Sequence, residues 1–289
     1  MCNHRLLATV FSILLSVQFL TAQIQIGARG GVSLGRLSDG SENIFSRDFS
    51  STSGFDIGAF VEIPITPLFS FQGEILFTDR GGERTGVQPI VPEALGESLA
   101  ATGTGITLDV LNAIITGAGG TAISNTNPLF GDFNNVSDLN YLEVPLLAKV
   151  GWGDQWRFYA VGGPYLSFLL SSEQVTGGSS GIFLDPTGAQ RLQVPNPFFN
   201  PIDPTFGPPV VDLPDQSFDA VTDTSDDLNS FNIGAQFGVG LNRKLGTKHS
   251  VLFDARSSVS FRSLQVNEDF GNSNVGGVVF SLGYAFSLG

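Results

Sequence analysis

The chain has 289 residues and a formal net charge of −13, with 14 Lys and Arg against 27 Asp and Glu. Nucleic-acid binding needs basic patches that meet phosphate, so this acidic composition argues against it. Charged residues make up only 14% of the chain, whereas Gly (36) and Phe (25) are abundant. This composition suits β-strands that turn one face toward lipid.

The first 22 residues have the order of a secretory signal peptide. A short start containing Arg5 is followed by a mostly apolar run, Leu6 to Leu20, and then by the small residue Ala22. The run is short and interrupted, which favours a cleaved signal over an uncleaved membrane anchor. We predict a signal peptide over 1–22 and one domain over 23–289. The single cysteine, Cys2, would leave with the signal, so no disulfide or thiolate metal site is expected.

From residue 23 onward the apolar residues recur with a period of two, which indicates strands with one face in an apolar environment. After residue 22, no apolar run reaches the roughly 20 residues of a spanning helix. Eight strands are predicted, in chain order over residues 24–37, 53–65, 68–79, 139–150, 156–171, 229–243, 249–262 and 274–288. In the second strand, Phe55 and Ile57 alternate with Asp56 and Gly58.

The connections between these strands alternate between long and short, beginning and ending with a long one. Bacterial outer-membrane barrels show this rhythm, with tight periplasmic turns and longer outer loops. Strands that cross a membrane must close into a barrel, because hydrocarbon cannot satisfy an open sheet edge. The predicted fold is all-β: an eight-stranded antiparallel up-and-down transmembrane β-barrel with two long outer loops, at about 80–138 and 172–228. The expected location is the bacterial outer membrane, reached through the periplasm.

A soluble β-sandwich or lipocalin-like barrel would show the same alternation with inside and outside exchanged. Aromatic residues near the short turns favour the membrane barrel, as in interfacial girdles. They are Trp152, Trp156, Phe69, Phe71 and Phe286. The polar face also favours it, because five acids and four bases share that face and a narrow lumen requires charges to pair. The predicted lumen charge network is Arg29, Asp56, Glu62, Glu74, Glu143, Lys149, Arg157, Asp254 and Arg256. We assign it a structural role, with a proton or ion path as the alternative.

The end of the chain resembles the C-terminal signal that the barrel-assembly machinery reads. A polar residue is followed two positions later by glycine and then by alternating apolar residues. The predicted signal residues are Ser281, Gly283, Phe286 and Leu288. Expected partners are therefore the barrel-assembly machinery during biogenesis and the lipid of the outer membrane.

Two strands resemble a known family. Residues 141–149 (Tyr-Leu-Glu-Val-Pro-Leu-Leu-Ala-Lys) resemble a strand of PorT-type, OmpA-like outer-membrane β-barrel proteins of Bacteroidota, and residues 158–167 resemble the strand that follows it. Asp254-Ala255-Arg256 also fits. The resemblance implies an outer-membrane location, and the protein that names the family is an accessory of a secretion system. It covers the strands and omits both long loops, so it carries the fold better than the role.

The first long loop contains apolar residues between 92 and 118, separated by Gly and Thr. This pattern predicts either a short helix over the barrel mouth or a strand pair that extends the wall, with an irregular loop as the simplest alternative. Loops of this length without any structure are uncommon.

The second long loop carries eight prolines between Pro186 and Pro214, with Phe198, Phe199 and Phe206 among them. Such a stiff segment cannot join a sheet interior, and it indicates a recognition surface or a rigid cap. The loop ends in a group of aspartates: Asp212, Asp215, Asp219, Asp223, Asp226 and Asp227. Their spacing matches no EF-hand loop, so a solvated charge run is favoured over a calcium site. No metal and no cofactor are predicted.

No catalytic residues are predicted either. His249, the only histidine of the mature chain, falls at a predicted periplasmic turn, and nothing pairs it with a serine. An eight-stranded barrel is filled by its own side chains, which argues against a free pore. The predicted function is a non-enzymatic barrel whose outer loops bind or have a surface-structural role. The alternatives are an accessory of protein secretion or envelope assembly with a protein partner, a narrow channel or transporter, and a lipid-modifying enzyme.

Overall fold

The computed structural model describes residues 24–39, 43–101, 106–196, 209–267, 269 and 271–288. The predicted signal peptide lies outside the described residues. The same holds for Phe198, Phe199 and Phe206 of the proline-rich loop.

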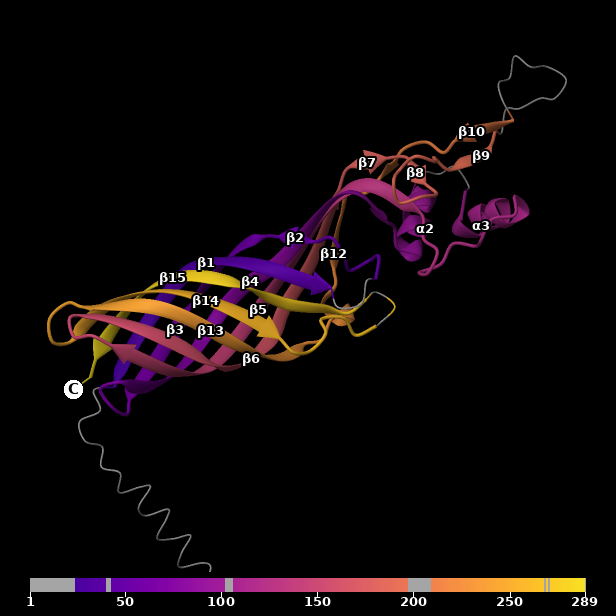
Figure 1. Ribbon diagram of the computed structural model, residues 1–289. Helices are drawn as coiled ribbons and strands as arrows, with labels where there is room; N and C mark the ends of the chain where they lie inside the picture. The colour runs from indigo at the N-terminus through magenta and orange to yellow at the C-terminus, as the bar shows by residue number, and fades with distance from the viewer. Residues whose placement is uncertain are drawn as a thin grey trace, which may run out of the picture.

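Eight long antiparallel strands form a closed ring within the described residues (Figure 1). They are β1 (Gln25–Asp39), β3 (Ser53–Pro64), β4 (Phe69–Pro89), β5 (Phe130–Trp152), β6 (Trp156–Gly177), β13 (Phe231–Lys244), β14 (His249–Ser260) and β15 (Ser273–Ser287). Each pairs with its neighbour in chain order. The ring closes where β1 pairs with β15, from Gln25 opposite Ser287 to Asp39 opposite Ser273. The predicted eight-stranded up-and-down barrel is confirmed.

The side chains of the wall alternate between a polar interior and an apolar exterior. Ile75 of β4 is 61% exposed, whereas Glu74 beside it is 2% exposed. Successive side chains of a strand point to opposite faces, so one sequence pattern produces both surfaces. A soluble barrel would bury the large apolar side chains. Their exposure around the ring therefore forms the lipid-facing belt of a membrane barrel.

The short connections and the ordered C-terminal end lie at one end of the barrel (Figure 1). Two of these turns contain glycines in the left-handed region, Gly153 (φ +107°) and Gly246 (φ +91°), which glycine adopts without strain. Trp152 and Trp156 are exposed at the same end, as predicted for a girdle. Because outer-membrane barrels have their tight turns in the periplasm, we call this the periplasmic end.

Three strands run farther from the membrane than the alternation predicts. β4 continues to Pro89, β5 begins at Phe130 and β6 continues to Gly177. The β4–β5 ladder extends without a break from Gly81 opposite Asp138 to Pro89 opposite Phe130. Beyond the lipid belt the outward positions become polar, so the period-two pattern ends while the pairing continues. The first long loop thus begins and ends as a strand pair that extends the wall, and the predicted bounds 80–138 and 172–228 are too wide.

The chain beyond these strand ends, together with the first four residues of β5, builds a second folded unit, which we call the outer lobe: the described residues of 90–133 and 178–218. It contains α2 (Pro92–Ala101), α3 (Leu108–Gly117), β7 (Ser179–Ser180), β8 (Ile182–Phe183), β9 (Gln193–Pro195), β10 (Val210–Asp212) and β11 (Gln216–Ser217). Between this lobe and the barrel lie β2 (Ser50–Ser51), β12 (Ala220–Asp223) and the 3-10 helix η2 (Ser225–Asp227). The lobe occupies the end of the molecule opposite the periplasmic turns (Figure 1). Among the described residues, no helix is long and apolar enough to cross a membrane.

The outer lobe has its own apolar core, separate from the barrel. Both helices contribute to it, with Leu95 and Leu99 from α2 and Leu111 from α3. The full set of buried core residues is Ile90, Leu95, Leu99, Leu111, Ile123, Leu129, Phe133, Ile182, Leu192, Val194 and Leu213. Helix α3 begins where the side chain of Thr107 accepts a hydrogen bond from the backbone N–H of Val110.

Candidate functional site

The centre of the lumen holds a network of five buried charged side chains. Both carboxylate oxygens of Glu74 accept hydrogen bonds from Nη1 of Arg256, at 2.8 and 2.9 Å. Nη1 of Arg29 lies 3.2 Å from Glu74, and its Nη2 lies 3.4 Å from Asp56 and 3.5 Å from Asp254. Asp254 also accepts from Arg256 at 2.9 Å. The network therefore joins β1, β3, β4 and β14 across the barrel.

Two further ion pairs lie on either side of this network. Toward the periplasmic end, Nζ of Lys149 donates to Glu62 at 2.7 Å and lies 4.0 Å from the centroid of the Tyr159 ring. Toward the outer end, Nη2 of Arg80 lies 2.9 Å from Glu143. Each charged group thus has an opposite charge within contact distance, which buried ions require. Eight of the nine predicted lumen residues take part in these contacts.

Arg80 is the lumen residue that sequence analysis missed, because the third strand was predicted to end at residue 79. The alternation through Gln72 and Glu74 would have placed Arg80 inside after three further steps of two. Arg157, by contrast, lies near the periplasmic rim and donates to the backbone carbonyl of Leu68 at 3.4 Å. With Arg80 in place of Arg157, four basic side chains pair with the five predicted acids.

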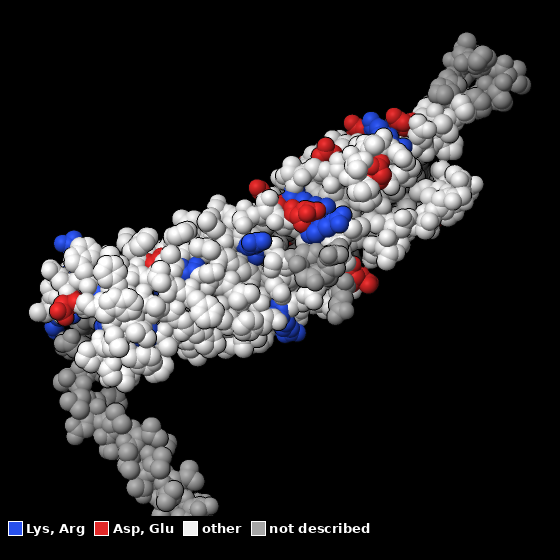
Figure 2. All heavy atoms as spheres, in the orientation of Figure 1, with Lys and Arg blue, Asp and Glu red and all other residues white. Residues whose placement is uncertain are grey.

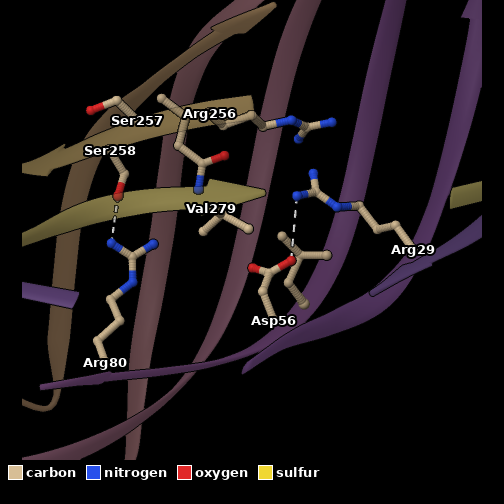
Figure 3. A pocket seen from close by; sticks show the side chains of 9 residues that line it. Arg29, Asp56, Arg80, Arg256, Ser257, Ser258 and Val279 are labelled. Atoms are coloured by element: carbon tan, nitrogen blue, oxygen red, sulfur yellow. Dashed lines mark hydrogen bonds and ion pairs between the residues drawn. The ribbon is translucent and has the colours of Figure 1, made fainter. Parts of the chain in front are cut away.

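Side chains from several strands line a small cavity at the centre of the lumen (Figure 3). This cavity has a volume of about 10 Å³ and is lined by nine residues, including Arg29, Asp56, Arg80 and Arg256. In Figure 3 the Arg80 guanidinium reaches the hydroxyl of Ser258, while Arg29 and Asp56 face each other. A space of this size holds one water molecule at most. The described lumen therefore offers no continuous column of water at this level.

A pair of carboxyl groups lies about midway along the paired strands β4 and β5. Asp79 follows Phe77, an outward aromatic of β4, and the Asp138 carboxyl of β5 lies beside it beyond the lipid belt.

The outer lobe is the second candidate site. The rings of Phe133, at the start of β5, and Phe218 stack on each other, and their centroids lie 4.6 Å apart. Arg191 forms an ion pair with Asp215 on its surface. Charged side chains of both signs gather over this half of the molecule, above a barrel wall that is nearly free of them (Figure 2).

Two aspartates of the second long loop, Asp212 and Asp215, pair with Arg191, and two others accept hydrogen bonds from the loop backbone. Asp219 accepts from the backbone N–H of Gly178 at 3.0 Å, and Asp223 accepts from that of Ser225 at 2.9 Å. These hydrogen bonds hold the pKa of both carboxyls below its ordinary value. Among the described residues, no three His, Cys, Asp or Glu side chains are grouped as they would be around a metal ion.

His249 and the end of the last strand lie at the periplasmic end, far from the outer lobe. Nδ1 of His249 is hydrogen-bonded to the hydroxyl of Tyr284. In the predicted assembly signal, Ser281 faces the lumen and donates to Asp254 at 2.7 Å. Leu288 is exposed, and its backbone N–H bonds to the carbonyl of Ile24. This end of the chain therefore completes the ring.

The fold is similar to solved outer-membrane proteins of low sequence identity. The chain aligns over 92% of its length with 98% of Neisserial surface protein A (NspA), at 9% identity and a TM-score of 0.38. Over 91% it aligns with 98% of Ail, the attachment invasion locus protein of Yersinia pestis, at 10% identity and a TM-score of 0.36. Over 92% it aligns with 97% of the N-terminal β-barrel domain of Pseudomonas aeruginosa OprF, at 10% identity and a TM-score of 0.31.

No protein of curated function matches the chain. The model of a protein family does, and it is described as the outer membrane protein beta-barrel domain. The match extends over residues 18–266, and so over most of the closed ring and both long loops. The chain belongs to this family of bacterial outer-membrane β-barrels.

Proposed function

We propose that this protein is a non-enzymatic surface anchor: the closed barrel holds the outer lobe outside the cell, and the lobe binds a partner or shields the surface. One contrast carries the proposal. The lumen is filled by paired charges, whereas the chain beyond the barrel builds a core of its own. This contrast supports a role for the outer lobe in binding or shielding over a role for the lumen in transport.

The lumen contacts support a structural role for the charge network. Glu74, Asp254 and Arg256 connect strands that lie far apart in sequence, and all three are buried. An ion path would need a connected space, and the cavity between these side chains measures about 10 Å³. We therefore favour a plug over a channel or a proton path.

The outer lobe supports a role at the surface. Two strands could be joined outside the membrane by a few residues, yet β4 and β5 are separated by 40 residues with two helices among them. Ordering such a segment costs conformational entropy, which its apolar core offsets. Elaborate loops on a rigid barrel are a common place for binding functions.

A role in secretion or envelope assembly is the alternative that the PorT-type resemblance raises. The resembling segment 141–149 contains Glu143 and Lys149, whose partners are Arg80 and Glu62 inside the lumen. Packing of the barrel therefore accounts for the resemblance without a secretion partner. The barrel-assembly machinery remains a proposed partner during biogenesis, through the segment from Ser281 to Leu288.

Surface labelling tests the proposed orientation. Cys2, in the predicted signal peptide, is the only cysteine of the chain, so a cysteine introduced into the mature part would be unique. We expect L184C, exposed in the outer lobe, to react with a membrane-impermeant maleimide on intact cells. T247C, in the periplasmic turn between β13 and β14, should react only after the outer membrane is permeabilised. The opposite pattern would place the lobe in the periplasm and refute the proposal.

A further inference from the structure

A groove lies on the lipid-facing surface of the barrel over β13, next to the turn that leads into β14. Figure 1 shows these two strands side by side in the wall. Its volume is about 300 Å³. It is lined by Trp156, Leu241, Arg243, Leu245, Val251 and Phe253. Trp156 belongs to β6 and Phe253 to β14, the two strands on either side of β13, and Leu241 of β13 lies opposite Phe253 in the ladder.

One cation lies at the periplasmic end of this groove. The Arg243 guanidinium lies 4.7 Å from the centroid of the Trp156 ring, and Arg243 is paired with Trp156 in the β6–β13 ladder. None of the ion pairs found among the described residues includes Arg243. A guanidinium group that lies over an aromatic ring can still donate hydrogen bonds from its N–H groups, in its own plane, to an oxyanion such as a phosphate.

We propose that this groove is a specific site for one glycerophospholipid of the periplasmic leaflet, with an acyl chain along Leu241 and Phe253 and the phosphate on Arg243. The position supports this occupant, because the groove opens to lipid and Arg243 lies at the level where tryptophans mark the headgroup layer. The charge supports it as well. Lys244 follows Arg243 at the end of β13, so the site favours a headgroup with a net negative charge.

Fluorescence quenching tests the site, because the chain contains only two tryptophans. W152F leaves Trp156 in the groove as the sole reporter. W156F leaves Trp152, which is exposed at the same end on β5, as the matched control for ordinary surrounding lipid. Each full-length variant is reconstituted into phosphatidylcholine vesicles that contain increasing fractions of phosphatidylglycerol with brominated acyl chains.

We expect Trp156 to reach half-maximal quenching at a phosphatidylglycerol fraction about five-fold lower than Trp152, the selectivity of about one basic contact. In the W152F background, R243Q should abolish this difference, and R243K should retain most of it. K248Q, which changes a charge of the turn outside the groove, should change it little. Heat-modifiable mobility on gels checks that each variant is folded. If both tryptophans reached half-maximal quenching at the same phosphatidylglycerol fraction, or if R243Q had no effect, the groove would contact only the ordinary lipid around the barrel. Either result would overturn the proposal.

Discussion

Replacing Glu74 by Gln is expected to lower the free energy of unfolding of the barrel by about 3–5 kcal/mol. Glu74 is fully buried and accepts hydrogen bonds from both Arg29 and Arg256 through its two carboxylate oxygens. The amide would break both buried ion pairs and turn an NH₂ group toward the two guanidinium groups, which would leave buried N–H donors without an acceptor. Urea unfolding of the refolded protein in detergent, followed by loss of the compact gel band, measures the change.

The matched control for Glu74→Gln lies on the same strand. Glu83 of β4 is exposed and forms none of the ion pairs found among the described residues. Glu83→Gln should leave the unfolding curve unchanged. Equal curves for both variants would contradict a structural role of the lumen network.

Replacing Leu111 by Ala is expected to destabilise the outer lobe by about 2–5 kcal/mol, the range for a large side chain removed from a packed core. Leu111 is fully buried among residues of α2, α3 and the small strands. Because this core is separate from the lumen, the lobe should become sensitive to protease while the barrel keeps its heat-modifiable mobility. Limited proteolysis and unboiled gels of the same samples show both properties.

Val110→Ala is the control for the lobe, since Val110 precedes Leu111 on the same helix and is exposed. It should leave protease resistance unchanged. If Leu111→Ala also abolished the compact band, the lobe and the barrel would form one cooperative unit, and their separate cores would not behave independently.

The ring of strands could be predicted because lipid imposes a strict alternation on each strand. Phe55 and Ile57 face outward and Asp56 inward as the period of two requires, and closure follows from the absence of edges in hydrocarbon. The alternation stops being informative beyond Phe77, where both faces of the wall become polar. The predicted strand therefore ended at residue 79, and Arg80 was assigned to a loop.

The sequence predicts that charges pair inside the lumen, but it does not predict which residues pair with which. Alternation places Glu74 and Arg256 on the inner face, but 182 residues separate them, and only the registers around the ring bring them together. The packing of the outer lobe is even harder to predict from the sequence. Its core combines Leu111 with Ile182 and Leu213 from a different loop, and neither loop shows a periodic pattern that would reveal the partner.

Conductance across a planar bilayer tests most directly the central claim that the barrel is an anchor with a filled lumen. The unmodified protein, shown to be folded by its heat-modifiable mobility, is added beside a porin of known conductance as the positive control. With the lumen closed around Arg80, Glu74 and Arg256, we predict no current above that of the bare bilayer. Discrete and reproducible open steps from the folded protein would contradict the claim and identify the lumen network as a conduction path.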